Sequence, residues 1–283
     1  MIKYTIKNFG VDFPDDNACL DYIFENRYGK DYECPKCHKK GFYRVKERKC
    51  YACAWCGYQL HPLANTIFHK SSTSLRNWFF AIFLMSQSKN GVSAKEIERQ
   101  VGVTYKTAWR VQRQIRRLMS PIKPKLKGTV EIDDTYIGGK HKGKRGRGAE
   151  GKTPVFGMVE RKGDVKAKVV DNLKKVTVKP LIENNIEQGT QVYTDEFLPY
   201  ADVKKYGFSH DVIKHQIKEY VRGNVHTNTL EGFWSQLKRS IHGTYHSVSP
   251  KHLQLYVDEF AFRYNHRFSG IPFFDLLLRR LVS

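Results

Sequence analysis

The sequence lacks an apolar stretch long enough to cross a membrane. Its longest uninterrupted apolar run, residues 78–85, is far shorter than the roughly 20 residues that a spanning helix needs. Residues 1–7 contain no apolar segment of the kind that secretory signal peptides carry. Internal repeats are absent, and residues 139–152 alone have low complexity. We therefore expect a globular cytoplasmic protein with no membrane partner.

Acidic residues are scarce. The 283 residues include 28 Asp and Glu against 49 Lys and Arg, which gives a formal net charge of +21. This excess is more than solubility requires and indicates a polyanionic partner, most simply nucleic acid. Proline is also sparse, with ten residues, and 40% of the chain is hydrophobic. The composition thus predicts an ordinary core, in one large domain or in two to three small ones.

Cysteine is rare outside one segment. Of the six cysteines, five lie within residues 34–56, and Cys19 fits the core of a first helix. Two CxxC motifs, Cys34 with Cys37 and Cys53 with Cys56, are separated by 15 residues, which suits four thiolates that close on Zn²⁺. Four protein ligands leave no open coordination position, so the zinc is expected to be structural. Cys50 begins an overlapping CxxC motif and stays open as a spare or alternate ligand.

Glycine, proline and capping residues divide the chain further. Helices are expected over residues 15–28 and 74–88, with Gly91 ending the second, and residues 121–128 have the composition of a linker. Beyond the linker, strand-like runs and helical segments predict a mixed α/β domain. The strand-like runs are 129–137, 154–160, 164–171 and 191–195, and the helical segments are 177–188, 229–241 and 251–265.

The predicted organisation is therefore an N-terminal DNA-reading half followed by an α/β domain. Its segments are an N-terminal helical segment (1–31), a zinc ribbon (32–68), a helix-turn-helix region (69–120), the linker (121–128) and the α/β domain (129–283).

Residues 93–119 have the length and central glycine of a helix-turn-helix. Ser93 with Glu96 forms a capping-box pattern for the first helix, Gly102 ends it, and Thr104 starts the second. Basic side chains on the second helix can meet DNA phosphates and guanine edges. A solvated basic face on a small helical bundle is the alternative, and the zinc ribbon and net charge favour DNA binding. The candidate DNA-binding residues are Lys106, Arg110, Arg113 and Arg117.

Three acids stand where a fold can bring them together. Asp133 lies in a strand-like run, Asp195 ends another, and Glu231 follows after 35 residues on a helix. Carboxylates from two strands and a helix can hold two Mg²⁺ or Mn²⁺ ions for in-line phosphoryl transfer. Each acid alone is more often a solvated surface group, so only the combination indicates metal-dependent cutting of DNA. Spacing does not exclude the neighbouring acids Glu131, Asp134 and Glu196.

Further residues flank these acids. Asn228, one turn before Glu231, either faces the same pocket or caps the helix. Lys238, two turns after Glu231, is expected to hold a DNA phosphate or to position a terminal base, the alternative being a solvated lysine. The basic segment 139–152 is also expected to hold phosphates, through Lys144, Arg145 and Arg147.

Together these motifs resemble a known family, the zinc-ribbon insertion-sequence transposases of the DDE superfamily, whose catalytic domains are similar to RNase H and retroviral integrases. The resemblance covers about residues 30–275, and the segment His226-Thr-Asn-Thr-Leu-Glu-Gly-Phe-Trp-Ser-Gln-Leu-Lys-Arg239 is highly specific. The other matching segments are 34–37, 105–109, 130–139, 193–195 and 260–267.

The resemblance implies an RNase H-like fold with Asp133 on the first strand, Asp195 at the end of the fourth, and Glu231 on the following helix. It also implies a homo-oligomer, dimeric or higher, at the nucleoid. This assembly binds terminal inverted repeats in double-stranded DNA, exposes 3′-OH ends and joins them to target DNA. The family usually has Asp-Glu where this chain has Asp133-Asp134, and the first acid is carried over. Some relatives include an asparagine in the catalytic set, so Asn228 shares or replaces part of the role of Glu231.

Two other functions fit the same motifs. In a DNA-binding regulator the zinc ribbon and helix-turn-helix act alone and the α/β domain is inert, but an inert domain is free to lose any of the three acids, which are all present. An RNase H-like nuclease without transposition activity would act on hybrids or junctions. The N-terminal DNA-reading segments fit recognition of element ends better.

Overall fold

A computed structural model describes residues 4–121, 124–138, 151–214, 217, 219 and 221–281. The chain forms two compact units, one of Met1–Leu118 with Ser269–Ser283 and one of Met119–Phe268. Within the described ranges, every helix is too short or too polar to cross a membrane. Three of the residues expected to hold phosphates lie outside the described residues, namely Lys144, Arg145 and Arg147.

The first unit opens with helices α1 (Ile6–Asp12) and α2 (Asp16–Tyr28). The Asp15 side chain accepts a hydrogen bond from the Ala18 N–H at 2.9 Å to start α2, and Gly29, with φ of 74°, ends it. Cys19 is fully buried on α2, in the core role that the sequence predicts. A small antiparallel sheet follows, made of β1 (Phe42–Arg44), β2 (Tyr51–Cys53) and β3 (Gln59–Leu60).

Helix α3 (Leu75–Gln87) is the apolar centre of this unit, and it ends four residues before Gly91. Helix α9 (Phe273–Arg279), from the far end of the sequence, packs against it. The Phe274 ring centroid lies 5.9 Å from those of both Phe13 and Phe83. An aromatic cluster therefore joins the N-terminal helices to the last residues of the chain.

Helices α4 (Ala94–Val101) and α5 (Tyr105–Arg117) form where the sequence predicts them. The Ser93 hydroxyl accepts from the Glu96 N–H at 3.1 Å, and the Thr104 hydroxyl accepts from the Thr107 N–H at 3.4 Å. Gly102 has the left-handed backbone, φ of 72°, which glycine adopts without a steric cost. Local capping thus fixes both helix starts and the turn between them.

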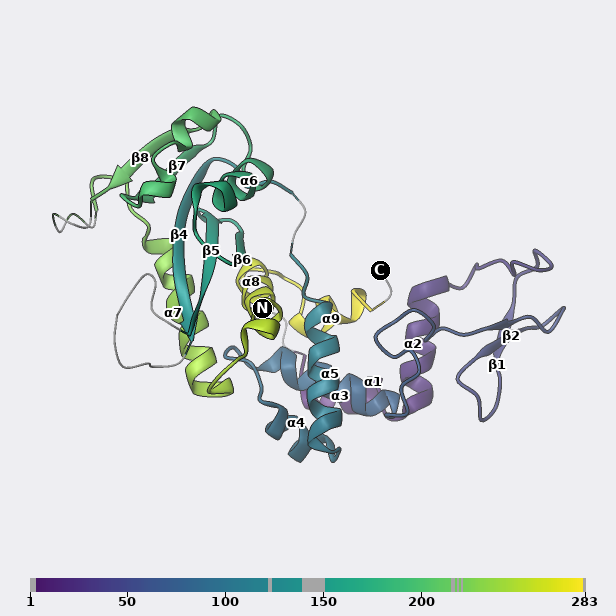
Figure 1. Ribbon diagram of the computed structural model, residues 1–283. Helices are drawn as coiled ribbons and strands as arrows, with labels where there is room; N and C mark the ends of the chain where they lie inside the picture. Colours follow the sequence, from purple (N-terminus) through teal and green to yellow (C-terminus); the bar gives the residue numbers. More distant parts are fainter. Residues whose placement is uncertain are drawn as a thin grey trace. The chain divides into compact units, whose positions relative to one another are not determined.

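The second unit is built on a five-stranded mixed sheet (Figure 1). Its strands are β4 (Thr129–Gly138), β5 (Lys152–Glu160), β6 (Val165–Val169), β7 (Gln191–Asp195) and β8 (Ser209–Ile213). The spatial order is β6-β5-β4-β7-β8, with β5 antiparallel to its two neighbours and β7 parallel to β4 and β8. This arrangement confirms the predicted mixed α/β class.

Helices cover both faces of the sheet. Helix α6 (Lys175–Asn185) packs on the face that carries Val130 and Ile132. Helices α7 (Asn228–Ser240) and α8 (Pro250–Asn265) pack on the other face, and a π-helical turn, η4 (Ile241–Tyr245), continues α7. Strand alternation puts Glu131 and Asp133 on this second face. Both faces of β4 are therefore covered, and Glu131 is fully buried.

Candidate functional site

The four cysteines of the two CxxC motifs meet at the small sheet. The sulfur atoms of Cys34, Cys37, Cys53 and Cys56 all lie within 4.8 Å of one another. The Sγ–Sγ distance is 3.6 Å both for Cys34 with Cys56 and for Cys37 with Cys53. Thiolates about 2.3 Å from one tetrahedral zinc ion lie about 3.8 Å apart, so the donor set fits Zn²⁺. Cys50 is buried but stands outside this group.

In the second unit, one pocket of about 560 Å³ brings acids and bases together beside β4 and α7. Asp133 and Glu231 line it, as does Lys238, two turns further along α7. The pocket therefore has an acidic part at the middle of β4 and a basic part toward the end of α7. The remaining lining residues are Asp134, Thr135, Trp234, Ser235, Arg239 and His242.

Asp195 lies near the same region because its strand, β7, pairs with β4. Strands β4 and β7 pair in parallel up to Glu131 with Tyr193, so the same register two residues further sets Asp133 beside Asp195. Asp195 does not line the pocket, and its Oδ1 accepts from the Phe197 N–H at 3.0 Å. Among the described residues, the cysteines alone gather at least three donors within 4.8 Å. The three acids are therefore neighbours whose oxygen atoms do not all lie within 4.8 Å of one another.

The pKa of Asp133 reflects its burial and the acids around it. Burial raises the pKa of Asp133 to about 7, and the nearby charges of Asp134, Asp195 and Glu231 raise it as well. Burial also lowers the pKa of Lys238, and the charge of Asp133 opposes that shift. Hard oxygen donors whose mutual repulsion is not balanced are the chemistry that favours a divalent cation. The acids therefore fit a Mg²⁺ or Mn²⁺ site.

Two hydrogen bonds orient the pocket acids. The indole Nε1 of Trp234 donates to Oδ2 of Asp133 at 3.2 Å, and the Thr227 hydroxyl donates to Oε1 of Glu231 at 3.0 Å. Asn228 is the exposed first residue of α7 and does not line the pocket. The N-cap of α7 is Thr227, so the alternative role of Asn228 as the cap is wrong.

The neighbouring acids that spacing left open have different surroundings. Glu131 is fully buried and accepts hydrogen bonds from the Thr229 and Leu230 N–H groups and from Arg161. Asp134 accepts from the Tyr200 hydroxyl at 3.0 Å. None of these contacts was evident from the sequence. Arg239 and His242 were also missed, although their spacing from Glu231, eight and eleven residues, matches one helical face.

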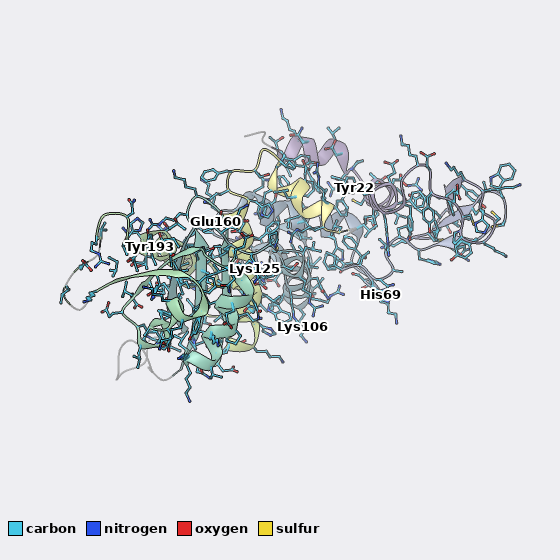
Figure 2. The ribbon with its side chains drawn as sticks, turned by 90° about the horizontal axis from the view of Figure 1, so that it is seen from above. Tyr22, His69, Lys106, Lys125, Glu160 and Tyr193 are labelled. Atoms are coloured by element: carbon cyan, nitrogen blue, oxygen red, sulfur yellow. The ribbon has the colours of Figure 1, made fainter. Side chains whose placement is uncertain are left out.

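The basic residues of α5 differ in exposure. Arg110 donates from Nη2 to the Ser71 and Thr73 hydroxyls at 3.2 and 3.1 Å and is partly buried. Arg113 is half-buried, with its guanidinium 5.7 Å from the Trp109 ring centroid. Lys106, which is labelled in Figure 2, and Arg117 are exposed. The exposed cations thus stand at the two ends of this helix.

Known proteins match both parts of the chain. Residues 125–265 match the ISXO2-like transposase domain, and residues 14–59 match the transposase zinc-ribbon domain. A protein in transposable element ISH50 of Halobacterium salinarum is 30% identical over 274 residues, which cover 89% of this chain and 91% of that protein. A transposase-like protein of Haemophilus influenzae is 29% identical over 115 residues, 41% of this chain and 90% of that protein.

Among solved structures, similarity extends to a chain in the simian T-cell lymphotropic virus intasome in complex with PP2A regulatory subunit B56 gamma. The match has a TM-score of 0.31 and 13% sequence identity, and it covers 64% of this chain and 65% of that chain.

Proposed function

The chain belongs to the ISXO2-like family of zinc-ribbon transposases, and on that premise we propose that it cuts DNA at the ends of its insertion sequence and joins the exposed 3′-OH ends to target DNA. The observation that most supports this proposal is the pocket in which Asp133 and Glu231 lie beside Lys238. Such a pocket can hold metal ions at its acidic part and DNA phosphates at its basic part.

The proposed catalytic domain has an RNase H-like fold and begins after the linker 121–128. The strand order β6-β5-β4-β7-β8 supports this fold. Along the chain, Asp133 lies on the first strand of the sheet, β4, and Asp195 ends the fourth, β7. Residues 269–281 were expected within this domain, and they pack in the first unit. The proposed roles of the first unit are a zinc ribbon at 32–68 and a DNA-reading helix-turn-helix within 69–120.

In the proposed reaction, Asp133, Asp195 and Glu231 hold Mg²⁺ or Mn²⁺. Bound there, the ions would supply Lewis-acid activation of the attacking oxygen and stabilisation of the leaving oxygen in an in-line displacement. The three acids act as ionised ligands, and Trp234 holds Asp133 by its indole N–H. Asn228 stands next to this set at the start of α7 and stays proposed as a residue that shares part of the role of Glu231.

DNA binding is assigned to basic residues from both units. Lys238, Arg239 and His242 would hold phosphates of the strand beside the cut, because they line the pocket that holds two of the acids. On α5, Lys106, Arg110, Arg113 and Arg117 remain proposed DNA contacts, and Lys106 and Arg117 are the exposed ones among them. Lys144, Arg145 and Arg147 remain proposed phosphate contacts. Joining two ends of one element to a target requires at least two active sites, so we propose a homo-oligomer.

A nicking assay tests this function. The substrate is a labelled duplex that carries the terminal repeat of the element, incubated with Mg²⁺ or with a chelator. Wild type should nick only with Mg²⁺, and Asp133→Ala should bind the duplex within about twofold of wild type without nicking it. Retained nicking in Asp133→Ala would overturn the site. Tight, salt-sensitive binding without nicking by either protein would instead favour a DNA-binding regulator.

A further inference from the structure

Helix α7 begins without a side-chain cap of its own. Thr227 is its N-cap and makes no side-chain capping bond, although helices usually start with such a bond to satisfy their first N–H groups. The missing acceptor comes from the sheet. Glu131 on β4, 98 residues before Thr229, accepts from the Thr229 N–H at 2.9 Å and from the Leu230 N–H at 3.1 Å. A fully buried carboxylate thus caps the helix across the fold.

Arg161 completes the connection. Its Nε donates to Oε1 of Glu131 at 2.7 Å. Its two terminal nitrogens donate to the carbonyl oxygens of Asn224 at 2.6 Å and His226 at 3.0 Å, in the segment that leads into α7. The guanidinium also lies 4.7 Å from the ring centroid of Tyr193 on β7, a residue labelled in Figure 2. One arginine therefore connects this entering segment to Glu131 and stacks on β7.

Glu131 and Arg161 lie where they can set the positions of Asp133 and Glu231. Glu131 lies two residues before Asp133 on the same face of β4, and Thr229 lies two residues before Glu231 on α7. The hydrogen bonds between Glu131 and α7 therefore join the two backbones that carry two of the acids. A buried ion pair contributes little net stability, but the planar guanidinium fork fixes the geometry of the groups that it holds.

We propose that Glu131 and Arg161 are positioning residues that hold Glu231 opposite Asp133 at the separation required to bind a divalent cation. This inference rests on the proposed function only in taking Asp133 and Glu231 as metal ligands. Neither residue of the pair is expected to touch DNA or metal, because Glu131 is fully buried and the Nε, Nη1 and Nη2 atoms of Arg161 all donate to protein oxygens.

The test compares two buried carboxylates in the second unit. Glu131→Gln removes the charge that caps α7, and Glu259→Gln is the matched control. Glu259 is also fully buried and accepts from Arg263 at 2.8 Å, but the two residues lie on α8. The probe is Mn²⁺ alone, titrated into zinc-loaded full-length protein by calorimetry, with Asp133→Ala as the blank for binding elsewhere. A second readout is hydrogen exchange of the Thr229 and Leu230 amides.

We expect Glu131→Gln to raise the Kd for Mn²⁺ at least about fivefold and to speed exchange at both amides, because α7 loses its cap. Glu259→Gln should leave the Kd within about twofold of wild type. Arg161→Lys is the second variant. It keeps the positive charge but not the fork, so it should weaken Mn²⁺ binding by a similar factor. This variant also serves if Glu131→Gln does not fold.

Three results would overturn the proposal: Mn²⁺ affinity unchanged in both Glu131→Gln and Arg161→Lys, an equal loss in Glu259→Gln, or no Mn²⁺ binding by the wild type beyond the Asp133→Ala blank. Nicking of DNA is a separate readout. If wild type binds Mn²⁺ and only the variants of the pair lose it, the positioning role stands even where no nicking is observed, and the proposed function alone fails.

Discussion

Trp234 of α7 lies directly over Gly157 of β5, so closely that a Cβ atom on Gly157 would stand 2.6 Å from Cη2 of the indole. Gly157 is the cross-strand partner of Asp133, and the same indole donates its N–H to Asp133. The absence of a side chain on β5 therefore makes the space from which Trp234 orients the first acid of the candidate site.

Replacement of Gly157 by alanine should destabilise the second unit. The added methyl group overlaps Trp234 and also comes 3.2 Å from Leu230, so α7 must shift away from β5. We expect a loss of about 1–3 kcal/mol in the free energy of unfolding, measured by urea denaturation. Gly232→Ala is the control, because that helical glycine has open space around it and alanine favours helix by about 1 kcal/mol. Equal stability of wild type and Gly157→Ala would contradict the packing argument.

Asp133→Asn should stabilise the protein at pH 8 when no divalent cation is added. Folding raises the pKa of Asp133 from 3.8 to about 7, so the folded state disfavours the ionised carboxylate. The wild type therefore loses stability as the pH rises from about 4 to 7, because the buried carboxyl must ionise, whereas the amide of Asn does not ionise. The gain at pH 8 should be of the order of 1–3 kcal/mol and smaller at pH 5.

Thermal unfolding at pH 5 and pH 8 checks this prediction. Added Mg²⁺ should raise the Tm of wild type at pH 8 more than that of Asp133→Asn, because a bound cation relieves the repulsion among the acids. A difference between the two proteins that does not change with pH would contradict the assigned burial of Asp133.

Features that depend on near neighbours could be predicted from the sequence. The starts of α4 and α5 follow from Ser93 and Thr104, whose hydroxyls accept from N–H groups three residues on. Period-two alternation predicted a strand over residues 129–137, and β4 ends one residue later, at Gly138. The spacing of the two CxxC motifs predicted the four grouped cysteines. In each case the information lies within a short segment or in a ligand spacing that chemistry restricts.

Features that depend on strand register could not be predicted. The pairing of Glu131 with Arg161 spans 30 residues, and only the order of the sheet brings their side chains together. Strand β8 and helices α1 and α9 also escaped prediction; α9 buries its apolar side chains against α3 and the N-terminal residues, which are far from it in the sequence. The place of Arg239 and His242 in the pocket could be predicted only by knowing which face of α7 meets the acids.

The zinc group gives a prediction that separates Cys50 from its neighbours. Cys37→Ser should lower the zinc content below one ion per chain and destabilise the ribbon, because three thiolates bind zinc more weakly than four. Cys50→Ser should keep one zinc ion per chain, since Cys50 stands outside the group of four. Metal analysis of the purified variants measures this directly, and loss of zinc from Cys50→Ser would make Cys50 a ligand.

The basic part of the pocket should bind DNA phosphates. Arg239→Gln should weaken binding of the terminal repeat about three- to tenfold and reduce the slope of log K against log salt by about 0.9 for each lost contact. His242→Gln should weaken binding less, because an imidazole offers fewer hydrogen-bond donors to a phosphate than the guanidinium of Arg239. The comparison is Lys251→Gln, an exposed lysine of α8 that does not line the pocket. Equal effects of Arg239→Gln and Lys251→Gln would indicate only a general charge effect.

The three-acid site is tested most directly at Asp195, whose place beside Asp133 follows from strand register and not from the pocket lining. Asp195→Asn and Glu196→Gln differ in position by one residue and each remove one negative charge. On the labelled terminal duplex with Mg²⁺, Asp195→Asn should lose nicking by more than about 100-fold, while Glu196→Gln should stay within about threefold of wild type. Nicking by Asp195→Asn at the wild-type rate, or its loss in Glu196→Gln instead, would contradict the three-acid site.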